Sequence, residues 1–161
     1  DRHIAESGKF FAVNAQTNAA NYGFNPVTKY SRANLVCIDM PEARIAAGDQ
    51  TETIAGVLMA KIQQRMEFEN IVVTQGKHGA TCHRPDQYRI TIPAFSSRAI
   101  DTMGAGDAFL AVTAPLVAAG LDLEAAAFVG NVAGAIKTDI VGHRRHVGRD
   151  ELLQVVEGLL K

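Results

Sequence analysis

A glycine-rich turn leads directly into an apolar helix at residues 100–109, which read Ile-Asp-Thr-Met-Gly-Ala-Gly-Asp-Ala-Phe. Gly104 and Gly106 carry no side chains, so the backbone can approach a ligand closely at this turn. The free amides of the first helical turn and the helix dipole both favour negative charge. We therefore predict a phosphate cradle at the start of a helix that extends from Ala105 to Ala119.

Asp107 lies in the first turn of this helix and admits two interpretations. An Asp at such a position often serves only as a helix cap, and acidic residues are favoured there by the dipole. Here Asp107 also follows the amides that would hold a transferring phosphoryl group. Its carboxylate could take the proton from an attacking hydroxyl while the amides stabilise the developing charge. In that interpretation, base and anion hole share one helix end.

Outward from the turn, short apolar strands come early and helices come late. The expected strands are residues 9–14, 34–39 and 71–74, followed by a hairpin of residues 80–84 and 88–92. The expected helices are one that starts at Pro41, one over 51–66 with Thr51 as its cap, and three over 105–119, 123–138 and 150–160. This order predicts a three-layer α/β/α domain with a largely parallel sheet and ligands beyond the carboxyl ends of its strands.

Residues 101–109 resemble the signature of the PfkB/ribokinase family of carbohydrate kinases. That signature has the form Asp-Thr-x-Gly-Ala-Gly-Asp, followed by a small residue and an aromatic, and the chain matches it throughout. The resemblance implies a ribokinase-like, Rossmann-like fold and an enzyme that transfers the γ-phosphoryl group of ATP. It implies that Asp107 is the catalytic base for the sugar hydroxyl and that Gly104, Ala105 and Gly106 form the anion hole.

Two further segments match the family in order and spacing. Thr74, Gly76 and Gly79 belong to a Thr-x-Gly-x-x-Gly turn, which the resemblance places along the ribose and phosphates of the nucleotide. Taken alone, two glycines after a strand indicate only a turn. The resemblance also assigns Thr102 to the nucleotide site and places Asn131 in a region that flanks the adenine. Tight helix packing is the alternative for that region.

The resemblance also implies metal sites. Asp39 and Glu42 occupy the place of the Asn-x-x-Glu motif, whose Glu organises Mg²⁺ and the phosphates through water, and Asp39 stands where the family has Asn. A carboxylate repels phosphate unless a metal lies between them. A helix N-terminus that favours acidic residues explains the same pair. Residues 140–143, with carbonyl groups near Asp101 and Met103, resemble a loop that binds a monovalent cation such as K⁺ in some members.

The composition favours a small-molecule partner. Sixteen Lys and Arg against seventeen Asp and Glu give a net charge of −1, so no global basic field attracts nucleic acid or an anionic membrane. Cys37 and Cys82 are too few for a disulfide scaffold, which favours a reducing cytoplasm. The uncharged stretch over residues 108–121 is too short to span a bilayer. We expect a cytoplasmic protein whose partner is a sugar or sugar phosphate. The oligomeric state is left open, with a homodimer as one alternative.

The resemblance extends from Phe10 to about Leu160 but corresponds to the second half of a family member. Residues 1–161 are therefore expected to be the carboxyl-terminal nucleotide-binding and catalytic portion of a kinase, inactive alone without the sugar-binding segment and β lid. Within the family, the chain looks closest to heptose-phosphate kinases. A nucleoside or vitamin-precursor kinase and a non-catalytic nucleotide-binding module are the alternatives. A dinucleotide-dependent oxidoreductase is disfavoured because the Gly-x-Gly lies late and lacks the third glycine.

Overall fold

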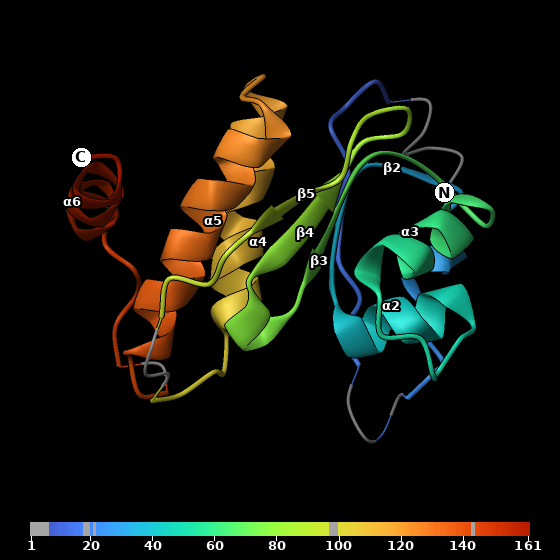
Figure 1. Ribbon diagram of the computed structural model, residues 1–161, viewed down its shortest axis with the longest axis horizontal. Coiled ribbons are helices and arrows are strands. Elements are labelled where there is room, and N and C mark those ends of the chain that lie inside the picture. The colour runs from blue at the N-terminus through green and yellow to red at the C-terminus, as the bar shows by residue number, and fades with distance from the viewer. Residues whose placement is uncertain (1–6, 18–19, 21, 97–99, 143) are drawn as a thin grey trace. The chain divides into compact units, whose positions relative to one another are not determined.

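The chain folds into two compact units in a computed structural model. The structure describes residues 7–17, 20, 22–96, 100–142 and 144–161. The first unit comprises Asp1–Gln75 and Thr81–Thr91, and the second comprises Gly76–Ala80 and Ile92–Lys161. Figure 1 labels the elements, which are described below unit by unit.

A mixed β-sheet runs through the first half of the chain, with the strand order β1-β2-β3-β4-β5 in the part that the structure describes. Its strands are β1 (Ala12–Val13), β2 (Arg32–Asp39), β3 (Glu67–Thr74), β4 (Ala80–His83) and β5 (Ile90–Ile92). β1 pairs with β2 in parallel, and β2 pairs with β3 in parallel. β4 and β5 are neighbours in the sheet, which confirms the predicted hairpin. The expected strand over residues 9–14 is shortened to the two residues of β1.

The core of the first unit lies between the sheet and two helices, α2 (Met40–Ala47) and α3 (Ala55–Gln63). α2 packs against α3, β2 and β3, and α3 also packs against β3 (Figure 1). Val36, Ile71, Leu58 and Ile62 are fully buried there. Within the parallel strands β2 and β3, residues 35–38 and 70–73 are buried in succession. A short 3₁₀ helix, η1 (Val27–Lys29), adds the buried Val27 to this core.

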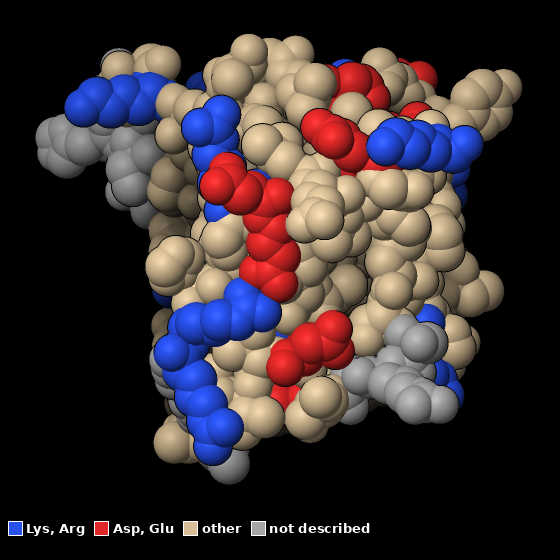
Figure 2. Space-filling model, turned by 90° about the vertical axis from the view of Figure 1, so that its left-hand side faces the viewer, with Lys and Arg blue, Asp and Glu red and all other residues tan. Residues whose placement is uncertain are grey.

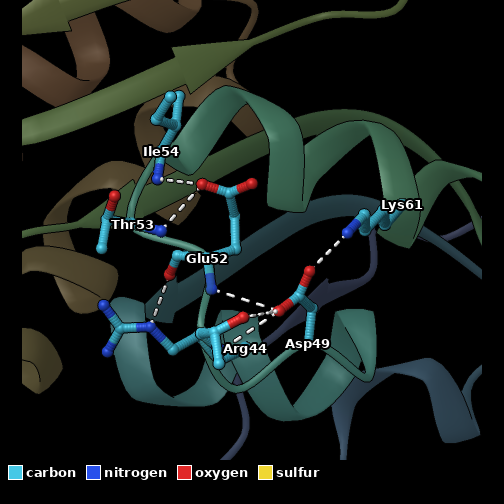
Figure 3. A network of polar contacts seen from close by, with 7 residues as sticks. Arg44, Asp49, Glu52, Thr53, Ile54 and Lys61 are labelled. Atoms are coloured by element: carbon cyan, nitrogen blue, oxygen red, sulfur yellow. Dashed lines mark hydrogen bonds and ion pairs between the residues drawn. The ribbon is translucent and has the colours of Figure 1, made fainter.

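The loop between α2 and α3 corrects one prediction, because Thr51 does not cap the second helix. The N-cap of α3 is Ile54. The Thr51 amide and hydroxyl instead donate to Oδ1 of Asp49, at 3.1 Å and 3.0 Å. Asp49 also accepts a hydrogen bond from the Lys61 ammonium of α3 (Figure 3). Thr51 therefore stabilises the loop rather than the helix end.

Glu52 completes this polar network. Its carboxylate accepts the amide hydrogens of Thr53 and Ile54, both at 2.8 Å, immediately before α3. Its carbonyl oxygen accepts a hydrogen bond from Nε of Arg44 at 2.7 Å, which links the loop back to α2 (Figure 3). The backbone amides that precede α3 are thus satisfied by a residue two positions before its cap.

Three helices dominate the second unit: α4 (Ala105–Ala118), α5 (Leu123–Thr138) and α6 (Arg149–Leu159). The unit also contains the 3₁₀ helix η2 (Gly76–His78). α4 and α5 pack closely, because a Cβ on Gly130 would lie 2.0 Å from Oγ1 of Thr113 and 3.1 Å from the carbonyl oxygen of Phe109. Only glycine allows this approach. All three helices agree with the predicted ranges to within one residue.

The surface carries both signs of charge. Figure 2 shows one face of the molecule, on which Lys and Arg side chains are intermixed with Asp and Glu. Arg145 and Glu151 form an ion pair, with Nη2 of the arginine 2.9 Å from Oε1 of the glutamate. Within the described ranges, no helix has both the length and the apolar character needed to cross a membrane.

Candidate functional site

The start of α4 has the backbone geometry of an anion cradle. Gly104 is the N-cap with φ of 78°, in the left-handed region, and no side chain among the described residues caps the helix. The Ala105 amide donates to the carbonyl oxygen of Thr102 at 3.2 Å, and the Ala108 amide donates to that of Gly104 at 3.0 Å. Within the described part of the chain, the amides of Gly106 and Asp107 have no backbone acceptor. Such orphan donors at a helix N-terminus are suited to a phosphate group.

The two glycines of the cradle differ in their surroundings. A Cβ on Gly106 would meet no atom of the described residues within 4 Å, so this position faces open space in the described structure. A Cβ on Gly104 would lie 3.3 Å from Cε of Lys137, a residue of α5. Gly134, also of α5, is close enough that its Cβ would lie 3.3 Å from the Ala105 carbonyl oxygen. The cradle is therefore supported from behind by α5 and open in front.

Asp107 is exposed and lies three residues after the N-cap, within the first turn of α4. Its side chain forms no hydrogen bond or ion pair with any residue that the structure describes. The cap interpretation therefore finds no support here, because a capping carboxylate accepts a backbone amide hydrogen. The carboxylate is available to a ligand at the same helix end as the orphan amides.

Asp101 holds the segment that enters α4. Its carboxylate accepts the amide hydrogens of Met103 at 2.9 Å and of Gly142 at 2.7 Å. Its own amide donates to the carbonyl oxygen of Thr138 at 2.9 Å. Thr102 between these contacts is exposed. Asp101 therefore ties the turn after α5 to the turn before α4.

Lys137 is a residue of this site that sequence reasoning missed. It is 7% exposed, and its Nζ donates to the carbonyl oxygens of Gly142 at 2.8 Å and Ile140 at 3.3 Å. These carbonyl groups belong to the segment predicted to bind a monovalent cation; its last residue, His143, lies outside the described residues. The only sequence signal is a charged residue within an otherwise apolar stretch near the end of α5.

The predicted magnesium residues lie in the first unit and form a capping box at the start of α2. The Glu42 amide donates to Oδ1 of Asp39 at 2.8 Å, and the Asp39 amide donates to Oε2 of Glu42 at 3.0 Å. The Thr17 amide donates to Oε1 of Glu42 at 3.2 Å. Asp39 also pairs with Thr74 at the carboxyl ends of β2 and β3. Among the described residues, no group of three or more His, Cys, Asp or Glu is arranged to hold a metal ion.

Thr74 ends β3 in the first unit, whereas the predicted nucleotide residues Gly76, Gly79 and Asn131 lie in the second unit. Gly79 has φ of 84°, and a Cβ there would lie 1.9 Å from the carbonyl oxygen of Ile92, so only glycine is tolerated. Gly76 has φ of 55° and open space around it. The Asn131 side chain donates to the carbonyl oxygen of Pro93 at 2.6 Å. Gly79 and Asn131 thus have structural contacts of their own.

The family model for pfkB family carbohydrate kinases matches residues 2–145. The chain belongs to this family. The predicted family and the ribokinase-like fold are therefore both confirmed. The bifunctional protein HldE of Pseudomonas savastanoi pv. phaseolicola is 31% identical over 116 residues, which are 71% of this chain and 24% of that protein. The chain thus spans about a quarter of the length of that pfkB relative.

Solved structures agree with the ribokinase-like fold. Phosphofructokinase-2 from Escherichia coli, in complex with potassium, is similar with a TM-score of 0.81 and 18% identity over 99% of this chain and 50% of that one. Ribokinase from Arabidopsis thaliana, complexed with ribose and ATP, gives a TM-score of 0.70 and 20% identity over 78% of this chain and 41% of that one. At these identities the likeness establishes the fold, and the function must be argued from the site.

Proposed function

We propose that residues 1–161 form the nucleotide-binding and catalytic portion of a kinase that transfers the γ-phosphoryl group of ATP to a hydroxyl of a sugar or sugar phosphate. The observation that carries this proposal is the start of α4, where the amides of Gly106 and Asp107 and the Asp107 carboxylate have no partner among the described residues. Membership of a carbohydrate kinase family supports the same reaction.

The cradle supplies the electrostatic part of the mechanism. The amides of Gly106 and Asp107 and the α4 dipole favour negative charge where a γ-phosphate would lie. The open space in front of Gly106 leaves room for a phosphoryl group. ATP supplies the phosphoryl group, and Mg²⁺ offsets its charge when both are bound. The structure of the Arabidopsis relative with ATP supports this choice of nucleotide.

Asp107 supplies the base. As the substrate oxygen attacks phosphorus, the Asp107 carboxylate accepts the hydroxyl proton, and the bond to the leaving phosphate breaks in line. An exposed carboxylate without an intramolecular partner can reorient toward a bound hydroxyl. The amides that precede it hold the transferring group, so proton acceptance and charge stabilisation occur at one helix end.

Other residues are proposed to position the nucleotide and its metal. We assign Thr74, Gly76, Gly79, Thr102 and Asn131 to the nucleotide, on the resemblance of their segments to the family. Glu42 and Asp39 are assigned to Mg²⁺ through water. A carboxylate has about four acceptor sites, so a place in the capping box is compatible with a water-mediated approach to the ion.

The experiment measures ADP release from ATP and Mg²⁺ with a panel of sugars and sugar phosphates. It compares the whole protein to which residues 1–161 belong with its Asp107→Asn variant. We expect turnover with at least one acceptor and a loss of about 10²–10⁴-fold in the variant, the usual contribution of a general base. Asp122→Asn is the matched control, because Asp122 is an exposed aspartate at the start of α5 that accepts the Glu124 amide hydrogen.

ATP affinity is measured on the same samples. Unchanged affinity with lost turnover in Asp107→Asn supports the base. If ATP binds but Asp107→Asn leaves turnover unchanged, or no acceptor is ever phosphorylated, then a nucleotide-binding module without catalysis replaces the kinase proposal.

A further inference from the structure

Lys137 is buried near the carboxyl end of α5, with 7% of its surface exposed. A lysine is almost never this buried unless its ammonium group has partners. Its partners are backbone oxygens, those of Gly142 at 2.8 Å and of Ile140 at 3.3 Å. The ammonium group therefore lies on the carbonyl oxygens of the turn that follows α5.

The same side chain lies directly behind the cradle. A Cβ on Gly104 would be 3.3 Å from Cε of Lys137 and 3.9 Å from Nζ. Asp101, which accepts the amide hydrogens of both Met103 and Gly142, fixes the turn after α5 relative to the start of α4. A positive charge held here adds to the α4 dipole in favouring an anion at the cradle.

This arrangement disagrees with the monovalent-cation site that the family resemblance implies. That site would use carbonyl oxygens of residues 140–143, yet those of Ile140 and Gly142 already accept hydrogen bonds from Lys137. K⁺ and an ammonium group carry the same charge and would have to lie close together to share these carbonyl oxygens, each of which has two lone pairs. Two such cations on one small set of carbonyl groups would repel each other strongly away from water. The residues present therefore do not suit K⁺.

We propose that the Lys137 ammonium group takes the place of the monovalent cation in this chain. It acts as a positioning residue that supplies a fixed positive charge behind Gly104 and makes nucleotide binding independent of K⁺. The inference rests on the proposed function, because it takes the start of α4 to be the phosphate cradle.

The test compares the affinity of residues 1–161 for Mg·ATP in potassium chloride and in choline chloride at equal ionic strength. Two variants accompany the wild type: Lys137→Ala, which opens the carbonyl cluster, and Lys137→Met, which removes the charge but fills the space. Lys61→Ala is the control, since Lys61 is a partly exposed lysine of the other unit. Thermal melting is recorded in both salts without nucleotide.

We expect the wild type and Lys61→Ala to bind ATP equally in the two salts. Lys137→Ala should bind about tenfold more weakly in choline chloride, a loss in the range of one nearby charge. Potassium or ammonium chloride should restore most of that affinity and raise its melting temperature. Lys137→Met should stay weak in both salts, because its side chain occupies the place of the ion. A residue with only a packing role would not produce this salt dependence.

The proposal is overturned if the wild type needs K⁺ for ATP binding, or if K⁺ neither restores nor stabilises Lys137→Ala. Should Lys137→Ala fail to fold, the salt dependence of the wild type decides alone. If neither the wild type nor any variant binds ATP, the proposed function fails. The melting temperatures in the two salts then still show whether Lys137 takes the place of K⁺. Selective stabilisation of Lys137→Ala by K⁺ would support the replacement, and equal stabilisation of the wild type would refute it.

Discussion

The two helices α2 and α4 both begin with an acidic residue in the first turn, yet they use it in opposite ways. At α2, the carboxylates of Asp39 and Glu42 accept each other's backbone amide hydrogens in a capping box. At α4, the cap is Gly104 and the Asp107 carboxylate has no partner among the described residues. A helix start whose amides are satisfied is stable by itself, whereas one whose amides are left unpaired is suited to a ligand.

Among substitutions at the N-termini of α2 and α4, Gly104→Ala should cause the largest loss of stability, together with a loss of turnover. The substitution forces a left-handed conformation on a residue with a Cβ and presses that Cβ against Lys137. The backbone strain alone is about 1–2 kcal/mol, and misplacement of the cradle should cost turnover about 10²-fold. Urea unfolding and ADP release measure the two losses separately.

Gly120→Ala is the matched control for this change. Gly120 has φ of 91° at the other end of α4, and a Cβ there would meet nothing within 4 Å. It should show a comparable loss of stability with full turnover. Equal losses of turnover in both variants would mean that strain in α4, rather than the cradle, controls activity.

A smaller effect distinguishes the two carboxylates. Asp39→Ala removes the acceptor of the Glu42 amide and should lower the free energy of unfolding by about 1 kcal/mol, as expected for a lost N-cap. Asp107→Ala removes no hydrogen bond within the described chain and should change stability by less than about 0.5 kcal/mol. Chemical denaturation of both variants is the measurement. If Asp107→Ala is as destabilising as Asp39→Ala, Asp107 is a cap and the contrast between α2 and α4 is lost.

The smallest effect concerns Asp49, a third carboxylate that is committed to its own backbone. Its hydrogen bond from Lys61, together with those from Thr51, holds the pKa of this carboxyl well below its usual range. Because the folded-state pKa is depressed, the stabilisation is present above the unfolded pKa of about 3.9 and is lost as the pH falls through the folded value. Asp49→Asn should therefore be less stable than the wild type at pH 7, with the difference narrowing below about pH 4.

Urea unfolding across this pH range checks the Asp49 prediction. Lys61→Met is the companion variant, since it removes the main cause of the shifted pKa. It should show the same narrowing as Asp49→Asn. A constant difference at all pH values would show that the contact does not depend on the charge of Asp49.

The helices could be predicted from the sequence more closely than the strands. α5 has its predicted bounds, Leu123–Thr138, because a long apolar helix repeats its pattern over several turns. β1 was expected over six residues and has two, Ala12 and Val13. It lies at the edge of the described sheet and pairs with a single neighbour, β2. An edge strand depends on one partner for its hydrogen bonds, and a sequence pattern does not specify that partner.

Local competition for hydrogen bonds explains the error at Thr51. A threonine before a helical pattern is a good cap candidate, but Asp49 lies two residues upstream and accepts both its amide and hydroxyl hydrogens. Side chains that bond to nearby backbone groups can therefore move a predicted helix start by several residues. Here the helix begins at Ala55.

The local geometry at the start of α4 could be predicted because it depends on the neighbouring chain, whereas contacts that depend on packing could not. The glycine cap and the exposed Asp107 follow from a continuous motif of ten residues. Lys137 could not be found in that way, because a lysine near the end of a helix usually interacts with the dipole from the surface. Its burial depends on how closely α5 approaches Gly104, and its partners depend on the path of the turn that follows.

The most direct test of the central claim compares the two helix starts by NMR on isotopically labelled residues 1–161. Amide resonances are followed on addition of Mg²⁺ with ADP, and then with a non-hydrolysable ATP analogue. We expect the amides of Gly106 and Asp107 to shift when the γ-phosphate is present and not with ADP alone. The Glu42 amide, already bonded to Asp39, should show no further shift between the ADP complex and the ATP-analogue complex. A γ-phosphate-dependent shift at Glu42 without one at Gly106 and Asp107 would contradict the assignment of the phosphate cradle to α4.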